Sequence, residues 1–266
     1  LQAPMASVQL TMSALILAFG LAQLVWGPVA DRYGRRPVLL AGLALYVLAS
    51  AGAAMATSVA AVVVGRALQG AAMSAAVVCA RAMVRDLYEP HEGAMVMARA
   101  LTGLGAVAIA SPLLAGVLVA GFGWRAAVAA MGVVGAVMGT FIALRVPETS
   151  RHRRPEATHI GPLLRQMGAT LAHPGFRAWS ALVMASYGGL FIFLAGSGFV
   201  LIGVLKLSPA VAGMVMSTCS MAYIAGTLLC RRWIPRFGLA GAVRRGGWIT
   251  LAACVSLLAL AVQPQP

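Results

Sequence analysis

The stretch "GPVADRYGRRP" at residues 27–37 decides the fold, because it places a cluster of charge between two long apolar runs. The charged residues are Asp31, Arg32, Arg35 and Arg36. Asp31 falls at the C-terminal end of the first run, where a helix dipole disfavours a carboxylate by about 0.3–1 kcal/mol. We therefore expect Asp31 to pair with a nearby arginine or with the N-terminus of another helix. Gly27 would let a neighbouring helix approach closely, and Gly34 would permit a tight reversal. The same residues also fit a loop that only sets the orientation of the chain.

The composition indicates that most of the chain is surrounded by lipid. Of its 266 residues, 61% are hydrophobic and 10% are charged, whereas a soluble domain is usually about a quarter charged. A net charge of +14 would suit nucleic-acid binding, but the basic residues sit in short gaps between apolar runs. This distribution argues against a nucleic-acid partner.

Eight segments have the length and apolarity of membrane-spanning helices, which need about 20 mainly apolar residues. Helices are expected because lipid cannot hydrogen-bond a bare backbone. The fold class is therefore predicted as an all-α, polytopic membrane protein. The predicted spans are residues 8–30, 38–56, 59–84, 93–119, 124–146, 176–204, 209–230 and 246–262.

The arginines predict the orientation of these spans. They concentrate in alternate gaps, whereas the intervening gaps hold only Arg125 and Lys206. The positive-inside rule puts the arginine-rich gaps in the cytoplasm. These gaps are residues 31–37, 85–92, 147–175 and 231–245. Residue 1 then lies outside without an initiator Met or a signal, and the chain ends in "AVQPQP" just after a span. We expect the chain to be cut at both ends.

The gap at 147–175 divides the chain into two halves. It is basic, contains several prolines, and separates five spans from three. We predict an N-terminal half at 1–147, a cytoplasmic linker at 148–175, and the start of a C-terminal half at 176–266. Apolar residues at 160–171 have helical spacing, which indicates an amphipathic helix on the inner membrane face; a plain linker is the alternative. "DRYG" at 31–34 recurs as "PRFG" at 235–238, and such repeats are typical of secondary transporters.

The opening loop resembles the signature of the major facilitator superfamily, G-x-x-x-D-R-x-G-R-R. The matching residues are Gly27, Asp31, Arg32, Gly34, Arg35 and Arg36. The resemblance implies a fold of two six-helix halves, of which the eight spans here would be the second to the ninth. It also implies that the loop is a cytoplasmic gate that holds the halves together when the transporter faces outward. Asp86, at the inner end of the third span, is expected to pair with Arg35 or Arg36.

The third span places Arg66, Gln69 and Gly70 on one helix face. Arg66 lies about 10 Å from the outer end at 1.5 Å per residue. A mid-membrane arginine costs about 2.5–3.5 kcal/mol on insertion scales, so Arg66 should face a polar cavity or a partner, unless it snorkels outward. The resemblance implies that these residues take part in proton coupling.

The fourth span, "GLGAVAIASPLLAGVL", resembles the antiporter motif of the same family, G-x-x-x-G-P-x-x-G-G. The residues that carry this resemblance are Gly105, Ser111, Pro112 and Gly116. The sequence departs from the motif at Ala110-Ser111-Pro112 and at Ala115-Gly116. Ordinary helix packing with a proline-weakened backbone is the alternative.

Longer stretches, such as "RALQGAAMSAAVVCARAMVRDLY" and "FLAGSGFVLIGVLKLSPAVAGM", resemble the bicyclomycin/chloramphenicol-resistance branch. This resemblance implies export of small amphipathic antibiotics in exchange for protons across a bacterial inner membrane. All six carboxylates fall in loops or at span ends. The proton-carrying carboxylate is therefore expected in a span that this chain lacks, and the fragment alone should not transport.

Candidate residues of the substrate cavity are polar or aromatic side chains within spans. Gln23 needs a partner because an uncharged polar group is costly in lipid. The aromatic candidates also fit core or lipid-facing positions. The full set is Gln23, Tyr187, Phe191, Ser197 and Phe199.

Other functions stay open from the sequence. A major facilitator protein that moves a metabolite, such as a sugar, osmolyte or organic anion, is one alternative, and a non-transporting membrane protein is another. The histidines lie in gaps and the cysteines are scattered, so no metal, cofactor or enzymatic activity is expected. The expected partners are a drug-like molecule, protons and the bilayer, and the family expectation is a monomer.

Overall fold

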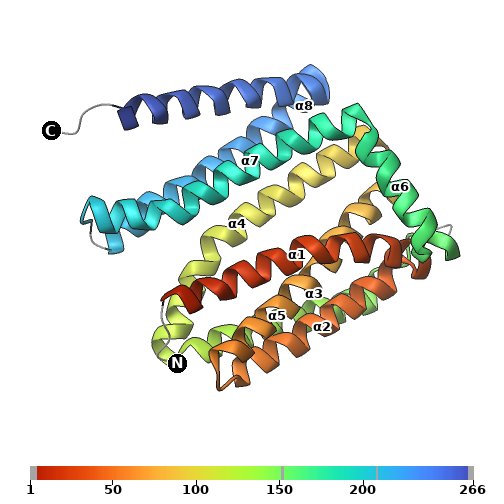
Figure 1. The fold of residues 1–266 in the computed structure, drawn as a ribbon, viewed down its shortest axis with the longest axis horizontal. Helices are drawn as coiled ribbons and strands as arrows, with labels where there is room; N and C mark the ends of the chain where they lie inside the picture. Colours follow the sequence, from red (N-terminus) through yellow and green to blue (C-terminus); the bar gives the residue numbers. More distant parts are fainter. Residues whose placement is uncertain (1–4, 151–152, 208, 263–266) are drawn as a thin grey trace. The chain divides into compact units, whose positions relative to one another are not determined.

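The computed structural model describes residues 5–150, 153–207 and 209–262, and every element in this part of the chain is helical. Figure 1 shows the helices in chain order. They are α1 (Met5–Tyr33), α2 (Arg35–Met55), α3 (Val59–Leu87), α4 (Pro90–Phe122), α5 (Trp124–Arg145), η1 (Pro155–Thr158), α6 (Ile160–Ala172), α7 (Pro174–Gly198), η2 (Phe199–Val204) and α8 (Pro209–Val262).

The chain divides into two compact units. Unit 1 comprises Leu1–Glu89 and Pro112–Ser208, and unit 2 comprises Pro90–Ser111 and Pro209–Pro266. The long helix α4 therefore contributes to both. The division of the sequence into halves at 1–147 and 176–266, with a linker between them, stays a prediction.

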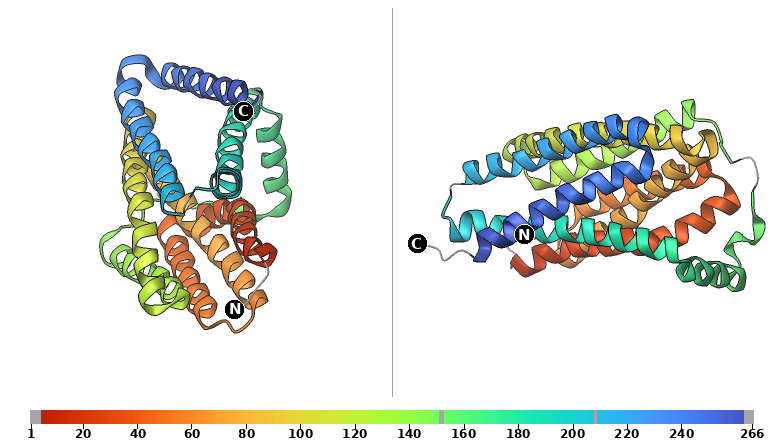
Figure 2. Two further views of the ribbon diagram at one scale, coloured as in Figure 1. Left: turned by 90° about the vertical axis from the view of Figure 1, so that its left-hand side faces the viewer. Right: turned by 90° about the horizontal axis from the view of Figure 1, so that it is seen from above.

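In unit 1, α3 packs against both α1 and α2, and α2 also packs against α5. Figures 1 and 2 show α1, α2 and α3, coloured red to orange, side by side. Small residues permit these contacts. A Cβ added at Gly42 on α2 would lie 2.5 Å from the Cβ of Ala75 on α3, and one added at Gly70 would overlap the backbone of Leu15 on α1. Close backbone approach at small residues is how helices associate in lipid, where burial of apolar surface gives no net gain.

The large apolar side chains point outward instead. Leu17, Leu48 and Val133 are each more than 60% exposed, whereas alanines such as Ala53 and Ala75 are fully buried. This pattern, with small residues inside and large apolar residues outside, is that of a protein whose solvent is hydrocarbon.

Over the described residues, five helical segments are long and apolar enough to cross a membrane. They are Leu10–Tyr33, Arg35–Met55, Val59–Leu87, Trp124–Arg145 and Met221–Ala259. Four of them lie where spans were predicted at 8–30, 38–56, 59–84 and 124–146. The fifth overlaps the predicted spans 209–230 and 246–262, and the spans at 93–119 and 176–204 stay predictions.

The predicted gap at 231–245 does contain a break between two helices, but the break is much shorter than predicted. This segment is helical within α8, apart from Gly238, whose φ of 67° and ψ of 176° break the helix. Charge alone does not end a helix, since arginine is a good helix former. The break falls at the residue that can adopt a positive φ without strain.

The linker contains the helix α6 at the place where an amphipathic helix was predicted, and α6 contacts η1 and α7. Leu164 and Leu171 are exposed on it, whereas Leu163 and Met167 are half-buried.

Gly70→Ala should destabilise the protein by about 1–3 kcal/mol, because the added methyl group meets the Leu15 backbone, which cannot rotate away. Gly52→Ala on α2 is the matched control, since a Cβ there meets no described atom within 4 Å. Thermal unfolding in detergent measures both. Equal midpoints for the two variants would show that α1 and α3 are not in contact at Gly70.

Candidate functional site: a charge cluster where α1, α2 and α3 end

The reversal between α1 and α2 takes place at one residue. Gly34 has a φ of 103°, a conformation that only glycine adopts readily, and its N–H donates to the carbonyl of Ala30 at 3.1 Å. Gly34 has no side chain to cap α2. The first backbone N–H groups of α2 therefore need an acceptor from elsewhere.

Glu148, which follows α5, supplies that acceptor. Its carboxylate accepts the N–H groups of Arg35 at 3.0 Å and Arg36 at 3.2 Å, and those of Thr149 and Ser150 at 2.9 Å. A carboxylate at a helix N-terminus also interacts favourably with the helix dipole. Sequence reasoning missed this role and treated Glu148 only as a loop carboxylate. Nothing in the local sequence signals it, because Glu148 lies 113 residues from Arg35.

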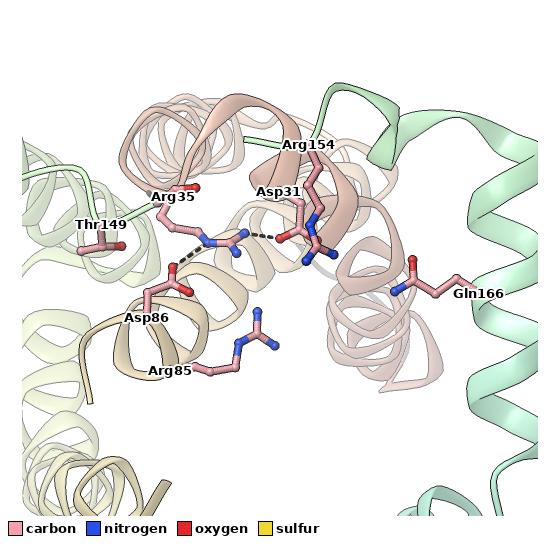
Figure 3. Close-up of a pocket in the computed structure, with 8 residues that line it drawn as sticks. Asp31, Arg35, Arg85, Asp86, Thr149, Arg154 and Gln166 are labelled. Atoms are coloured by element: carbon pink, nitrogen blue, oxygen red, sulfur yellow. Dashed lines mark hydrogen bonds and ion pairs between the residues drawn. The ribbon is translucent and has the colours of Figure 1, made fainter. Parts of the chain in front are cut away.

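Arg35 joins the ends of three helices. Its Nη1 donates to Oδ1 of Asp31 at 2.5 Å, and its Nε donates to Oδ2 of Asp86 at 3.1 Å. Figure 3 shows the two carboxylates on opposite sides of the guanidinium. Arg35 is 7% exposed, while 37% of the Asp31 side chain is exposed. The arginine is thus enclosed, and one of its carboxylate partners is open to solvent.

These contacts answer two expectations from the sequence. Asp31 has an arginine partner, and Asp86 pairs with Arg35. Arg36 instead donates to the carbonyl of Ala143 on α5. The helix register explains the difference, because Arg35 and Arg36 are about 100° apart around α2 and face different neighbours.

Two residues of the predicted linker, Arg154 and Thr158, contact the end of α1 beside the charge cluster. Arg32 donates to the hydroxyl of Thr158 in η1, and the backbone N–H of Arg154 donates to the carbonyl of Asp31 at 2.9 Å. A pocket of about 430 Å³ opens beside the cluster (Figure 3). Its lining consists of Asp31, Arg35, Arg85, Asp86, Thr149, Ser150, Arg154 and Gln166. With three guanidinium groups and two carboxylates, this pocket suits exchange of charged partners.

The expectation that Gly27 lets a helix approach closely is wrong for the part of the chain that the structure describes. A Cβ added at Gly27 meets nothing within 4 Å. The contact of α1 with α3 lies elsewhere, at Gly70 and where Trp26 Nε1 donates to the carbonyl of Ala71 at 2.7 Å. Gly27 instead lines a second pocket with Asp31 and Arg35.

Arg66 and Gln69, which the sequence placed on one helix face, are in direct contact. Nη1 of Arg66 donates to Oε1 of Gln69 at 3.0 Å, and the guanidinium also lies near the sulfurs of Met12 and Met131. Gln69 is buried, and its Nε2 donates to Oγ of Ser50 at 2.7 Å. Their neighbour Gly70 makes the backbone contact with α1 described above.

The helix that carries the predicted antiporter motif packs closely within unit 2. A Cβ at Gly105 would lie 2.9 Å from Cγ1 of Ile224 on α8. One turn earlier, Thr102 Oγ1 and Thr227 Oγ1 are 3.2 Å apart. Ser111 is exposed. The side chain of Pro112 and the surroundings of Gly116 lie outside what the structure describes.

The cavity candidates occupy α1 and α7. Gln23 is half-buried on α1, while on α7 Tyr187 is exposed and Ser197 is buried. The side chains of Phe191 and Phe199 lie outside the described residues. A role of these residues in substrate binding stays a prediction.

The pKa of the Glu148 carboxyl reflects its position. Burial raises this pKa, but the four backbone N–H donors together lower it by more. The pKa therefore lies below the ordinary value of 4.5. The donors favour the charged form. A carboxylate with a lowered pKa stabilises the folded state above the unfolded pKa, and this contribution is lost as the pH falls through the folded pKa.

Glu148→Gln should therefore lower stability at neutral pH by about 0.5–2 kcal/mol, the usual contribution of a helix cap. The variant should also lose less stability than the wild type as the pH falls from 6 to below the lowered pKa of Glu148, since its amide does not titrate. Thermal unfolding in detergent across this pH range tests both effects. Glu156→Gln, at an exposed carboxylate in η1, is the control and should follow the wild type. Parallel pH profiles for the wild type and Glu148→Gln would contradict the cap.

Comparisons with known proteins bear on this arrangement. The sequence profile of the Major Facilitator Superfamily matches residues 1–265. The chain is 31% identical over 253 residues to the chloramphenicol resistance protein of Pseudomonas aeruginosa. The aligned region covers 94% of this chain and 59% of that protein. It is 32% identical over 233 residues to multidrug resistance protein D of Escherichia coli (strain K12). This alignment covers 87% of this chain and 58% of that protein.

The fold is similar to that of a solved transporter. The proton:xylose symporter XylE, bound to 6-bromo-6-deoxy-D-glucose, aligns with a TM-score of 0.62 at 16% identity, over 85% of this chain and 59% of that one. This likeness confirms the predicted all-α, major facilitator fold. The chain spans less than two thirds of the length of each of these proteins. The family resemblance drawn from the loop at 27–37 is confirmed: this chain is a multi-pass membrane protein that belongs to the major facilitator superfamily of transporters.

Proposed function

We propose that the protein exports small amphipathic drugs across the bacterial inner membrane in exchange for protons, by alternating access. The observation that carries the substrate class is the similarity to a chloramphenicol resistance protein over 94% of this chain. The similarity to multidrug resistance protein D supports the same class.

The charge cluster supports the gate in this proposal. Alternating access requires two arrangements of similar free energy that exchange contacts. Arg35 is enclosed and keeps two carboxylate partners, whereas Asp31 is partly open and keeps an oxygen for a further donor. Asp31 can therefore gain or lose a partner while Arg35 stays neutralised by Asp86. We propose this exchange as the step that closes and opens the cytoplasmic side.

Arg66 supports proton coupling. It is half-buried within a span, and the six carboxylates of the sequence lie in loops or at the ends of spans. A fixed positive charge favours deprotonation of any acid nearby. In this proposal Arg66 therefore acts on a proton-carrying group that another part of the complete protein supplies.

Expression of the complete protein should lower drug accumulation in cells, and a protonophore should restore it. Arg66→Ala should abolish the export that a pH gradient drives, because the guanidinium no longer repels the proton. Radiolabelled drug in inside-out vesicles measures this directly. Full gradient-driven export by Arg66→Ala would remove the coupling role, and no effect of the wild-type protein on accumulation would remove the efflux function.

Asp31→Asn should lower export by about tenfold, since the charged hydrogen bond to Arg35 is lost. The amount of protein in the membrane should not change, because Arg35 keeps Asp86. Glu89→Gln, at an exposed carboxylate between α3 and α4, is the control and should export normally. Unchanged export by Asp31→Asn at equal expression would count against the gate.

A further inference from the structure

A chain of side-chain hydrogen bonds leads from the backbone of α2 to Arg66 on α3. The hydroxyl of Ser50 donates to the carbonyl of Tyr46 at 2.7 Å. Nε2 of Gln69 donates to Oγ of Ser50 at 2.7 Å, and Nη1 of Arg66 donates to Oε1 of Gln69 at 3.0 Å. Ser50 carries no motif and was not among the residues selected from the sequence.

The donors and acceptors allow one direction of this chain. The Ser50 proton points to Tyr46, so the lone pairs of its oxygen face Gln69 and accept the amide N–H. The amide oxygen of Gln69 then faces Arg66, which can only donate. If the amide were reversed, its NH₂ group would face the guanidinium, and two donors would oppose each other. Ser50 and Arg66 thus select the same orientation of Gln69 from opposite ends.

Burial makes this selection effective. Ser50 is 0% exposed and Gln69 is 1% exposed, so water cannot replace a lost partner. Helix α5 closes the site from a third side, since a Cβ at Gly132 would lie 3.2 Å from the Cβ of Ser50. Arg66 lies at the more open end, beside the two methionine sulfurs, which are weak acceptors. Gln69 is therefore the strong acceptor that holds the guanidinium in place among the contacts described.

We propose that Ser50 is a positioning residue for Arg66. By fixing the amide of Gln69, it directs the amide oxygen at the guanidinium and confines that charge to one place in the membrane. The consequence for proton coupling rests on the function proposed above, whereas the positioning itself does not. Without Ser50, only Arg66 holds the Gln69 amide in this orientation, so the amide is less confined and the guanidinium is held less firmly.

The positioning is tested by the reactivity of Arg66 toward phenylglyoxal, an arginine reagent, in vesicles that contain the complete protein. Labelling of each arginine is quantified by mass spectrometry. Ser50→Ala should raise the labelling rate of Arg66 by about fivefold, which corresponds to the loss of one hydrogen bond. Ser74→Ala is the matched control, because Ser74 is also 0% exposed and donates to a carbonyl of its own helix, that of Ala71. Its Arg66 should label like that of the wild type.

Two variants of Gln69 make the result independent of how well Ser50→Ala folds. Gln69→Leu removes the acceptor and should raise labelling as Ser50→Ala does. Gln69→Glu offers a carboxylate to both Ser50 and Arg66 and should keep labelling at or below the wild-type rate. Raised labelling in Gln69→Leu with wild-type labelling in Ser50→Ala would overturn the positioning role.

Transport separates this inference from the proposed function. Ser50→Ala should lose most export driven by a pH gradient but keep the exchange of labelled for unlabelled drug, which needs no proton. If Ser50→Ala raises labelling but the wild type shows no proton-linked export, the proposed function fails and the positioning stands. If the wild type shows proton-linked export and labelling does not change in Ser50→Ala, the positioning fails and the function stands.

Discussion

The ion pairs of Arg35 with Asp31 and Asp86 are the interaction on which the arrangement of α1, α2 and α3 depends. Lipid offers neither a counter-charge nor a hydrogen bond, so charged groups of a membrane protein gather at span ends and pair there. Arg35 begins α2, while Asp31 and Asp86 lie near the ends of α1 and α3. One guanidinium therefore joins the start of α2 to the ends of α1 and α3. Because this guanidinium is buried, leaving it unpaired would be costly.

Glu148 supplies hydrogen-bond acceptors to the backbone at the start of α2, as the two aspartates do to the side chain of Arg35. It accepts the N–H groups that Gly34 leaves free, and it comes from the segment just after α5. The linker then returns to α1 through the contacts of Arg32 and Arg154. A displacement of α1 at this end has to break these contacts or carry the linker with it, which couples the cluster to the segment that follows α5.

The packing of the helices also reflects a surrounding solvent of hydrocarbon. Small residues meet at the helix contacts and large apolar side chains face outward, because apolar surface gains nothing by leaving lipid for protein. Polar groups inside the bundle must find partners within it. The hydrogen bonds from Tyr46 through Ser50 and Gln69 to Arg66 meet this requirement across α2 and α3. The charged guanidinium of Arg66 lies at the last position of this chain of hydrogen bonds.

Apolar length, arginine distribution and the motif at residues 27–37 were enough to predict four of the helical spans, the family and the need of Asp31 for a partner, because each depends on local composition or on the field of a single helix. The tertiary structure alone decided which arginine pairs with Asp86, that Glu148 caps α2, and that Ser50 holds Gln69. These contacts join residues 19 to 113 positions apart, and no local pattern encodes which helix faces meet. The same reason explains the error at Gly27, because close approach depends on the neighbour rather than on the glycine.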